Sequence, residues 1–513
     1  MLVADRIAEL EQNNAHLLTE NRQLKHQLDW FKRQLFGEKS EKRLDIDPAV
    51  QGSLFAGLGL TLPPKEEALG ETITYQRRKK HHDDSVNDCG LRFSDDVPKQ
   101  VIVLTDAEME SLPEGECEII GEKVSYRLAQ RTGSYVILEY RRRVYKRRSD
   151  LQIVTTPAAD NVLEKTVSDV SLLAGLLIDK FNYHLPLYRQ HQRLQQAGIQ
   201  LSRSTLTHWA TRAIDLLGPI VDAQTRHILQ GSVLAMDETP IKAGRQKKGK
   251  MRQAYLWPMY GEEDEIVFQY AASRAHHHVQ VWLKGYQGTL LTDGYEAYSA
   301  FSQNNPSVTH AQCWSHCRRK FEQAKDSEPE ACAEALDLIG ALYRHEQIIR
   351  DQTLTGKDKQ AYRARHSEPI VRGFWSWCEQ QCQRLELLPK DPLSIALKYA
   401  MNRQANLEVF LANPDVPIDT NHLERGLRPI PMGKKNWLFC WTEIGAERVG
   451  VIQSLLVTCR LQGVDPYVYL IDVLQRISSH PAARVNELTP RLWKEQFAHN
   501  PMRSDLVVSH HGE

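Results

Sequence analysis

Length, composition and charge limit what this chain can be. Its 513 residues exceed what one hydrophobic core usually organises, so we expect several domains. The 65 lysines and arginines equal the 65 aspartates and glutamates, so only local clusters of charge can point to a nucleic-acid partner. No apolar run approaches the roughly 20 residues that cross a bilayer, and the nine cysteines form no dense framework. We therefore expect a cytoplasmic protein without disulfides.

The first residues follow a heptad pattern. Two interleaved series recur at seven-residue spacing: Ile7, Asn14, Asn21, Leu28 and Leu35, and Leu10, Leu17, Leu24 and Phe31. Asparagine at the core positions of a coiled coil favours a paired, in-register dimer. The pattern predicts a dimerisation helix within residues 1–44. The alternative is a single amphipathic helix that packs on its own domain.

A linker and a small basic module are expected next. Residues 45–75 contain Gly, Pro and acidic residues with little periodicity, which is typical of a linker. Within residues 76–160, the alternation from Tyr135 to Tyr145 predicts a strand flanked by arginines. Arg142 and Arg143 are therefore candidate phosphate contacts, and a solvated run of charge is the alternative.

Residues 161–225 carry the signals of a helix-turn-helix. Ser168, Pro186 and either Ser202 or Ser204 are placed to begin three successive helices, and a Gly turn precedes the third. The first residues of a recognition helix meet base edges in the major groove. The candidate DNA contacts are Arg203, Ser204, Thr205, Thr207 and His208. Ordinary helical hairpins share this spacing, so a simple hairpin remains the alternative.

Two acidic residues each follow a predicted strand. Val233–Met236 ends at Asp237, and Gly288–Thr292 ends at Asp293. Two further strands and a helix are predicted between them, at Ala254–Met259, Ile266–Tyr270 and about His276 to Leu283. Three strands, a helix and another strand form the order of a ribonuclease H-like sheet. In such a sheet neighbouring strand ends would present both carboxylates together.

Glu424 lies on a predicted short helix that can return a third carboxylate to this place. Clustered carboxylates repel unless a cation neutralises them, and their hard oxygen ligands favour Mg²⁺ or Mn²⁺. We predict that Asp237, Asp293 and Glu424 hold two ions for an in-line phosphoryl displacement. The alternative is that the strand-end acids serve as turn formers or helix caps.

Basic and aromatic residues near these acids are further candidates for DNA contact. They are Lys247, Lys248, Trp314, Arg318, Arg319, Lys320, Arg425, Arg428, Lys434, Lys435 and Trp437. Trp437 could stack an unpaired base or belong to the core, and the lysines after Asp237 could form a solvated hairpin. Cys313, His316 and Cys317 have a helical spacing that fits packed thiols better than a metal site.

Six segments resemble, in order, the transposases of insertion sequence family 66. They are Leu35-Phe36-Gly37 leading to Ser40-Glu41-Lys42, Met236-Asp237-Glu238-Thr239-Pro240, Leu291-Thr292-Asp293-Gly294-Tyr295, Cys313-Trp314-Ser315-His316-Cys317-Arg318-Arg319-Lys320-Phe321, Glu424-Arg425-Gly426-Leu427-Arg428-Pro429-Ile430 and Gly463-Val464-Asp465-Pro466-Tyr467. The resemblance runs to about residue 480. It implies that Asp237, Asp293 and Glu424 form the acidic triad of a ribonuclease H-like catalytic core.

The resemblance also sets the expected organisation. The fold class is multidomain α/β and α: coiled coil, helix-turn-helix region, then a catalytic core over residues 226–450 with a helical insertion at about 322–412. A C-terminal helical region and tail would occupy 451–513. The implied activity is a DNA transposase that cleaves transposon ends and transfers the strands into target DNA. Its partners would be double-stranded DNA, as terminal inverted repeats and target, a second copy of the chain, and accessory proteins of the same element, with no membrane.

The sequence departs from the family in a possible zinc site. The family commonly has a zinc module with paired cysteines, whereas Cys89 here has no CxxC partner and Cys117 is remote. Zinc needs four tetrahedral ligands, so we predict no structural zinc in residues 76–120.

Two other functions compete with the transposase interpretation. They are a non-catalytic DNA-binding regulator and a ribonuclease H-like nuclease.

Overall fold

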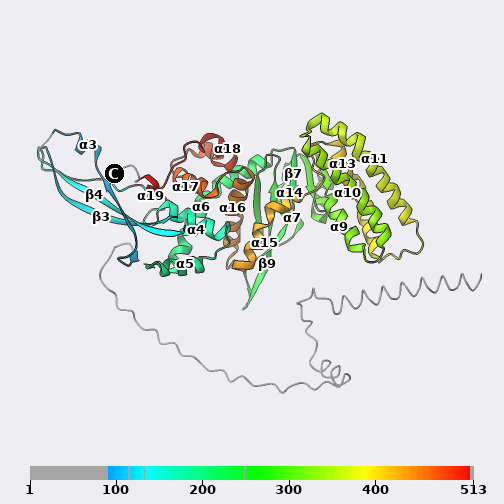
Figure 1. The fold of residues 1–513 in the computed structure, drawn as a ribbon, viewed down its shortest axis with the longest axis horizontal. Coiled ribbons are helices and arrows are strands. Elements are labelled where there is room, and N and C mark those ends of the chain that lie inside the picture. Colours follow the sequence, from blue (N-terminus) through cyan, green and yellow to red (C-terminus); the bar gives the residue numbers. More distant parts are fainter. Residues whose placement is uncertain (1–90, 114–115, 132, 248, 439, 509–513) are drawn as a thin grey trace, which may run out of the picture. The chain divides into compact units, whose positions relative to one another are not determined.

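The computed structural model describes residues 91–113, 116–131, 133–247, 249–438 and 440–508 (Figure 1). The predicted coiled coil of residues 1–44 and the predicted linker of 45–75 lie outside these residues. So do Cys89, on which the zinc prediction depends, and Lys248.

The first described region is a small β-sheet. Its strands are β2 (Lys99–Leu104), β3 (Cys117–Arg131), β4 (Ser134–Arg147) and β5 (Ile153–Thr155). β4 lies between a parallel β2 and an antiparallel β3, and it also pairs with β5. The strand predicted around Tyr135–Tyr145 is therefore present as β4. The short helix α3 (Ala107–Glu110) follows β2, and β1 (Arg92–Phe93) pairs with β6 (Ile199–Gln200).

Three helices follow where the helix-turn-helix was predicted. They are α4 (Val170–Phe181), α5 (Leu187–Gln196) and α6 (Arg203–Ile228). Ser202 caps α6, because its Oγ accepts a hydrogen bond from the Thr205 amide at 3.0 Å. Pro186 precedes α5 as predicted, but the cap of α4 is Asp169 and not Ser168. The Asp169 carboxylate accepts from the Ser171 amide at 2.8 Å, so the error is one position.

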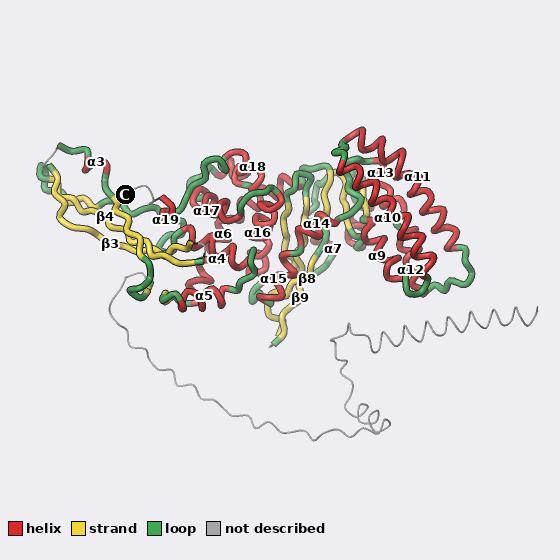
Figure 2. Tube along the Cα trace, in the orientation of Figure 1, coloured by secondary structure: helices red, strands yellow, loops and turns green. Residues whose placement is uncertain are grey.

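The middle of the chain forms a six-stranded sheet (Figure 2). Its strands are β7 (Val233–Met236), β8 (Thr239–Lys247), β9 (Lys250–Tyr260), β10 (Ile266–Ala271), β11 (Gly288–Thr292) and β12 (Val308–Gln312). The order is β10-β9-β7-β11-β12, with β8 paired to β9. The first three strands of this order are antiparallel, whereas β7, β11 and β12 are parallel to one another. The basic stretch after Asp237 forms the β8–β9 hairpin.

Helices connect and flank these strands. α7 (His276–Trp282) and α8 (Glu296–Asn304) lie before and after β11 in the sequence. After β12 come α9 (Trp314–Ala324), α10 (Pro329–Asp351), α11 (Gly356–Cys382), α12 (Pro392–Met401) and α13 (Gln404–Ala412). The remaining elements are α14 (Asn421–Leu427), α15 (Pro429–Trp437), α16 (Glu443–Leu461), α17 (Pro466–Arg476), the 3-10 helix η1 (Ala482–Leu488), α18 (Pro490–Gln496) and α19 (Asp505–Val508).

Helix α16 covers the edge strand β10, and two of its buried hydroxyl groups bond to backbone amides of that strand. Ser454 Oγ accepts a hydrogen bond from the Phe268 amide at 2.9 Å, and Thr458 Oγ1 accepts from the Ile266 amide at 3.2 Å. Without these partners the amides of an edge strand would be buried and unsatisfied. A Cβ on Gly450 would lie 2.4 Å from the Phe268 carbonyl oxygen, so glycine permits this close approach. The helix therefore completes the edge of the sheet that carries the acidic residues.

Candidate active site

Asp237 and Asp293 lie side by side at the carboxyl ends of two neighbouring strands. β7 and β11 are parallel, and Ala235 is paired with Leu291. Each aspartate comes two residues later, so the two side chains reach the same edge of the sheet. Glu238 joins them: carboxylate oxygens of Asp237, Glu238 and Asp293 lie within 4.8 Å of one another. We call these three residues the acidic cluster.

The backbone around Asp293 is held by α12. The Tyr399 hydroxyl donates a hydrogen bond to the Asp293 carbonyl oxygen at 2.7 Å. Gly294 has φ +101°, and a Cβ there would lie 2.8 Å from Arg403 Nε. The Asp293 carboxylate itself accepts from the Tyr295 amide at 2.8 Å. The turn after β11 is thus fixed by a helix that is remote in the sequence.

The negative charge of Glu238 is balanced by the guanidinium of Arg274. Its carboxylate, only 4% exposed, is bonded to the Arg274 guanidinium and accepts a hydrogen bond from the Tyr298 hydroxyl at 3.1 Å. The Arg274 guanidinium also lies 3.9 Å from the centre of the Tyr295 ring. We did not predict Glu238 or Arg274 from the sequence. The acidic pair Asp237-Glu238 directly after a strand was the available signal for the first of them.

Within the described residues, Asp237 has no basic partner of this kind. Its Oδ1 accepts a hydrogen bond from the Glu238 amide at 2.7 Å. Burial is the main cause that raises the pKa of Asp237 to about 7; the charges of Asp293, Glu238 and Glu424 act in the same direction, and the backbone hydrogen bond opposes them. A carboxylate in this state binds a proton or a cation more readily than an ordinary aspartate. The acidic cluster therefore has the electrostatics of a cation site.

Glu424 approaches from α14 without joining the acidic cluster. Its Oε1 lies 3.9 Å from His316 Nε2 and 3.9 Å from an Arg319 nitrogen. The Thr420 amide and hydroxyl both donate to Cys313 Sγ at 3.3 Å, which fixes the start of α14 against the start of α9. The structure thus brings all three predicted acids into one region, but it places only the two aspartates in contact range.

His316 is a third residue that the sequence did not single out for this site. It is mostly buried, and its Nδ1 has no hydrogen-bond partner among the described residues. Burial lowers the pKa of His316, while the nearby charges of Asp293 and Glu424 oppose that shift. His316 and Arg319 are one helical turn apart on α9, so helical spacing was the signal that could have found them together.

The neighbouring cysteines are packed thiols. Cys313 and Cys317 are buried, and burial raises the pKa of Cys313 to about 11. A metal ligand must be a thiolate, so this burial disfavours metal binding at the pair. This agrees with the packed-thiol interpretation of the Cys313, His316 and Cys317 spacing.

Trp314 was predicted to contact DNA, and its burial shows that this prediction is wrong. Its indole is 0% exposed, packs against Phe374 and Phe410, and donates from Nε1 to the Leu407 carbonyl at 2.8 Å. It is a core residue, because the apolar helices after α9 enclose it. The charged residues beside it differ: Arg319 is half exposed near Glu424, Arg318 pairs with Glu322 at 2.9 Å, and Lys320 lies over the Tyr399 ring.

The first turns of α6 present a polar surface. Arg203, Ser204, Thr207 and His208 are exposed and Thr205 is half-buried, whereas Leu206 and Trp209 are buried. The predicted reader residues are therefore accessible on one side of the helix. On β4 the arginines have partners within the protein: Arg143 pairs with Glu110 at 3.4 Å, and Arg142 reaches the Thr156 carbonyl at 3.5 Å. Their role in DNA contact stays a prediction.

The basic residues after Glu424 divide by exposure. Arg425, Arg428 and Lys435 are exposed, and Lys434 is half-buried with its Nζ donating to the Pro240 carbonyl at 2.6 Å. Trp437 is half-buried against Gly433 and His184. On the β8–β9 hairpin Lys247 is exposed.

A second group of histidine and carboxylates lies elsewhere, around Arg491. His227 Nε2 is 2.8 Å from a Glu263 oxygen and 3.4 Å from Glu265, and Arg491 Nε is 3.0 Å and 3.5 Å from the same two carboxylates. Glu265 is 1% exposed. We call these four residues the Arg491 cluster. A guanidinium among its carboxylates makes it an ion-pair network that ties α18 to α6 and the start of β10.

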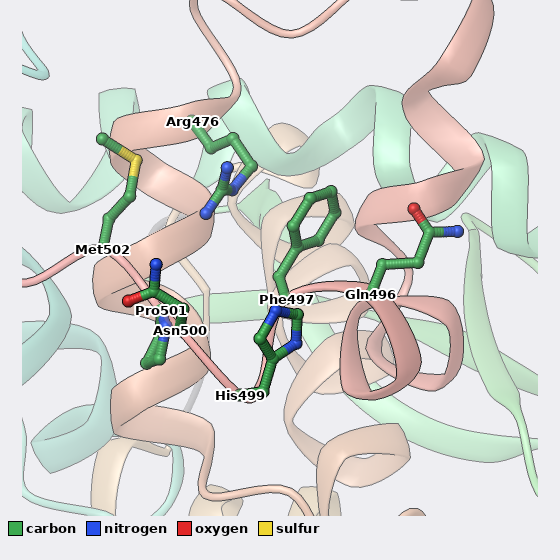
Figure 3. A pocket seen from close by; sticks show the side chains of 7 residues that line it. All are labelled: Arg476, Gln496, Phe497, His499, Asn500, Pro501 and Met502. Atoms are coloured by element: carbon green, nitrogen blue, oxygen red, sulfur yellow. The ribbon is translucent and has the colours of Figure 1, made fainter.

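A hollow near the C-terminus is also unrelated to the acidic cluster. It has a volume of about 390 Å³ and is lined by Arg476, Gln496, Phe497, His499, Asn500, Pro501 and Met502 (Figure 3). The Arg476 guanidinium is already bonded to Asp472 at 2.6 Å and lies over the Phe497 ring. Asp472 also accepts from the Trp493 indole and the Met502 amide. These groups serve the packing of the C-terminal helices.

Comparison with known proteins identifies the class to which the fold and the acidic site belong. Residues 165–448 match the model of the Transposase IS66 family, residues 454–491 match the IS66 C-terminal element, and residues 23–87 match the Transposase C of IS166 homeodomain. The last match extends across the predicted linker and lies outside the described residues. The chain belongs to the IS66 family of transposases.

The names of two curated relatives state no function. The Uncharacterized protein y4hP of Sinorhizobium fredii (strain NBRC 101917 / NGR234) is 30% identical over 403 residues, which cover 74% of this chain and 72% of the relative. The Uncharacterized protein y4qI of the same strain is 29% identical over 392 residues, with coverage of 72% and 71%. Membership of the family implies a DNA-processing enzyme. Among the described residues, no helix has the length and apolar character needed to span a membrane.

Proposed function

We propose that this chain catalyses metal-dependent cleavage of DNA at transposon ends and joins those ends to target DNA. The residues that carry the chemistry are Asp237, Asp293 and Glu424. The single observation behind the proposal is the acidic cluster: the carboxylates of Asp237 and Asp293 lie together at adjacent strand ends, and no basic side chain in the described part of the chain is paired with either of them.

The donor set fits Mg²⁺ or Mn²⁺. Carboxylate oxygens are hard ligands, and the raised pKa of Asp237 reflects a surplus of negative charge that a divalent ion would relieve. Asp237 and Asp293 would hold two such ions, and Glu424 would add a carboxylate from α14. Bound Mg²⁺ or Mn²⁺ supplies activation of an attacking oxygen and stabilisation of a leaving oxygen in phosphoryl transfer.

The remaining residues of the site bind and orient DNA. Arg319 is half exposed and lies 3.9 Å from Glu424, where its guanidinium can hold a phosphate next to the carboxylates. Arg274 keeps the Glu238 charge neutral, so that the net charge of the cluster is set by the two aspartates. His316 lies 3.9 Å from Glu424, within the influence of the Asp293 charge, and positions the Glu424 side chain relative to α9.

The sheet supports a ribonuclease H-like core. Its order β10-β9-β7-β11-β12 combines three antiparallel strands with two further parallel strands and places both aspartates at its centre. Helices α10 to α13 lie in the sequence between β12 and α14, which supports the insertion proposed for about 322–412. The region 161–225 would read DNA through α6, and residues 1–44 would pair two copies of the chain.

The experiment that tests the function supplies a DNA end with a free 3′-hydroxyl together with a supercoiled target plasmid. Joined products that form in Mg²⁺ and not in chelator are the expected result. Cleavage without joining would identify a nuclease instead. Specific end binding with neither reaction would identify a regulator. An accessory protein of the same element is added in a parallel arm, since the family often encodes such partners.

A further inference from the structure

Cys313 lies between two segments that carry acidic residues of the proposed site. Its amide donates a hydrogen bond to the Thr292 carbonyl at 3.1 Å, at the strand end that leads into Asp293. Its Sγ accepts hydrogen bonds from the Thr420 amide and hydroxyl, both at 3.3 Å, at the start of the helix that carries Glu424. One residue is therefore bonded to the segments of both Asp293 and Glu424.

Thr420 uses its hydroxyl for a contact between elements. It is the N-cap residue of α14, but its side chain does not cap the helix. A threonine at this position usually accepts a hydrogen bond from an amide of the first turn, which stabilises the helix locally. Here the hydroxyl donates to Cys313 Sγ instead. Since α14 has only seven residues, its placement depends on contacts with other elements, and the Thr420 hydroxyl supplies one of them.

The contact between Cys313 and Thr420 is closed to solvent. Each of the two residues is 1% exposed. Water therefore cannot replace the sulfur as the acceptor for the Thr420 amide, and a buried amide without an acceptor is unfavourable. The Trp314 amide adds a second link, because it donates to the Ile418 carbonyl at 3.1 Å. The start of α9 and the segment that leads into α14 are thus held together at two points.

The position of Thr420 determines where the Glu424 carboxylate lies. The Glu424 amide donates to the Thr420 carbonyl at 2.9 Å, and residues four apart share one face of a helix. A displacement of Thr420 is therefore passed directly to Glu424. The Glu424 carboxylate in turn lies 3.9 Å from His316 Nε2, three residues after Cys313. The start of α9 consequently contacts both Thr420 and Glu424.

We propose that Cys313 is a positioning residue of the active site: its sulfur, through Thr420, sets the placement of the Glu424 carboxylate as the third ligand of the divalent ions. The inference rests on the proposed function, in which Asp237, Asp293 and Glu424 hold those ions. Cys313 is buried and acts only through Glu424. Removing a residue that orients a metal ligand in this way typically lowers metal affinity or activity by about 10- to 100-fold.

The test measures Mn²⁺ binding to the full chain without DNA, by electron paramagnetic resonance of the free ion. Cys313→Ala removes the acceptor and should weaken Mn²⁺ binding about tenfold. Cys313→Ser keeps an acceptor for both Thr420 donors and should retain most of the affinity. The matched control is Cys332→Ala, which removes an equally buried thiol from α10 and should leave Mn²⁺ affinity unchanged.

A double-mutant cycle shows whether Cys313 acts through Glu424. In the Glu424→Gln background the third carboxylate is already lost, so Cys313→Ala should cause no further loss of Mn²⁺ affinity. A loss as large as in the wild-type background would overturn the inference, because the thiol would then support the fold of the whole site. Unchanged Mn²⁺ affinity in Cys313→Ala alone would overturn it as well.

Thr420→Val provides a second variant of nearly unchanged shape. It removes the hydroxyl donor and keeps the amide, so Mn²⁺ affinity should fall by about threefold, the scale of one hydrogen bond. In DNA cleavage both variants should lower kcat and leave KM for the DNA end unchanged, since the metal site and not the DNA surface is altered. If thermal denaturation shows that Cys313→Ala does not fold, Thr420→Val decides, and wild-type Mn²⁺ affinity in that variant would overturn the inference.

The same measurements distinguish this inference from the proposed function. Loss of cleavage in Glu424→Gln, together with wild-type cleavage and Mn²⁺ affinity in Cys313→Ala, would remove the inference and leave the proposed function. Weakened Mn²⁺ binding in Cys313→Ala, together with a wild-type chain that neither cleaves nor joins DNA in Mg²⁺, would remove the proposed function and leave the positioning role of Cys313.

Discussion

The acidic cluster and the Arg491 cluster contain similar groups and differ in how their charge is balanced. In the Arg491 cluster the guanidinium of Arg491 and the imidazole of His227 lie against both carboxylates. In the acidic cluster Arg274 compensates Glu238, while Asp237 and Asp293 form no ion pair with a basic side chain among the described residues. Acidic side chains alone therefore do not define a metal site. The deciding feature is whether the protein supplies the neutralising charge itself.

The largest difference between the two clusters should appear in catalysis. Asp237→Asn, Asp293→Asn and Glu424→Gln each preserve shape but remove one negative oxygen, so strand cleavage should fall by at least about 100-fold, as when one transition-state stabiliser is removed. DNA binding should survive, as measured by gel shift. The matched control is Glu263→Gln, which removes a carboxylate from the Arg491 cluster and should leave cleavage unchanged.

Two outcomes would change the assignment. Near-normal cleavage by Glu424→Gln would transfer the third ligand to Glu238, whose carboxylate is already within 4.8 Å of both aspartates. Near-normal cleavage by all three variants would show that the acidic cluster is not the active site.

A smaller effect, on stability, should appear at the Arg491 cluster. Arg491→Leu leaves Glu265 buried without its guanidinium, and breaking a largely buried ion pair in this way costs about 2–4 kcal/mol of unfolding free energy. Urea denaturation at neutral pH measures this loss. Adding Glu265→Gln to Arg491→Leu should recover most of it, because no buried charge then remains. If the double variant is as unstable as the single one, packing by Arg491 and not its charge ties α18 to the sheet.

The smallest effect concerns pH and metal at Asp237. The pKa of this carboxyl is raised from 3.8 to about 7, so its contribution favours the folded state below about pH 4 and is lost as the pH rises to about 7. In chelator, the melting temperature of the wild-type chain should therefore fall by a few degrees more than that of Asp237→Asn between pH 5 and pH 8. Thermal denaturation followed by circular dichroism measures both chains.

Adding a divalent metal ion provides the control for this comparison of melting temperatures. Mn²⁺ at pH 8 should raise the melting temperature of the wild-type chain and of Glu263→Gln, because both keep the aspartates. It should have little effect on Asp237→Asn or Asp293→Asn. A Mn²⁺ response that persists in both aspartate variants would place the cation elsewhere in the chain.

Local sequence pattern was enough to predict the elements that present the two aspartates. The apolar runs Val233–Met236 and Gly288–Thr292 are strands with the predicted bounds, and Asp237 and Asp293 follow them directly. Runs of apolar residues that end in an acid are local signals, since strand formation and burial depend on neighbouring residues in the sequence. The caps at Pro186 and Ser202 were predictable for the same reason.

Tertiary structure alone decided which side chains compensate or cover one another. Trp314 looked like a surface aromatic beside arginines, yet helices more than fifty residues later enclose it. The pairing of Glu238 with Arg274, the approach of His316 to Glu424 and the attachment of Cys440 to Ala243 likewise join segments that are remote in sequence. Periodicity shows which face of each element is buried in the core, whereas the balance of charge depends on which elements pack together. Only the folded chain therefore separates the proposed metal site from an ion-pair network.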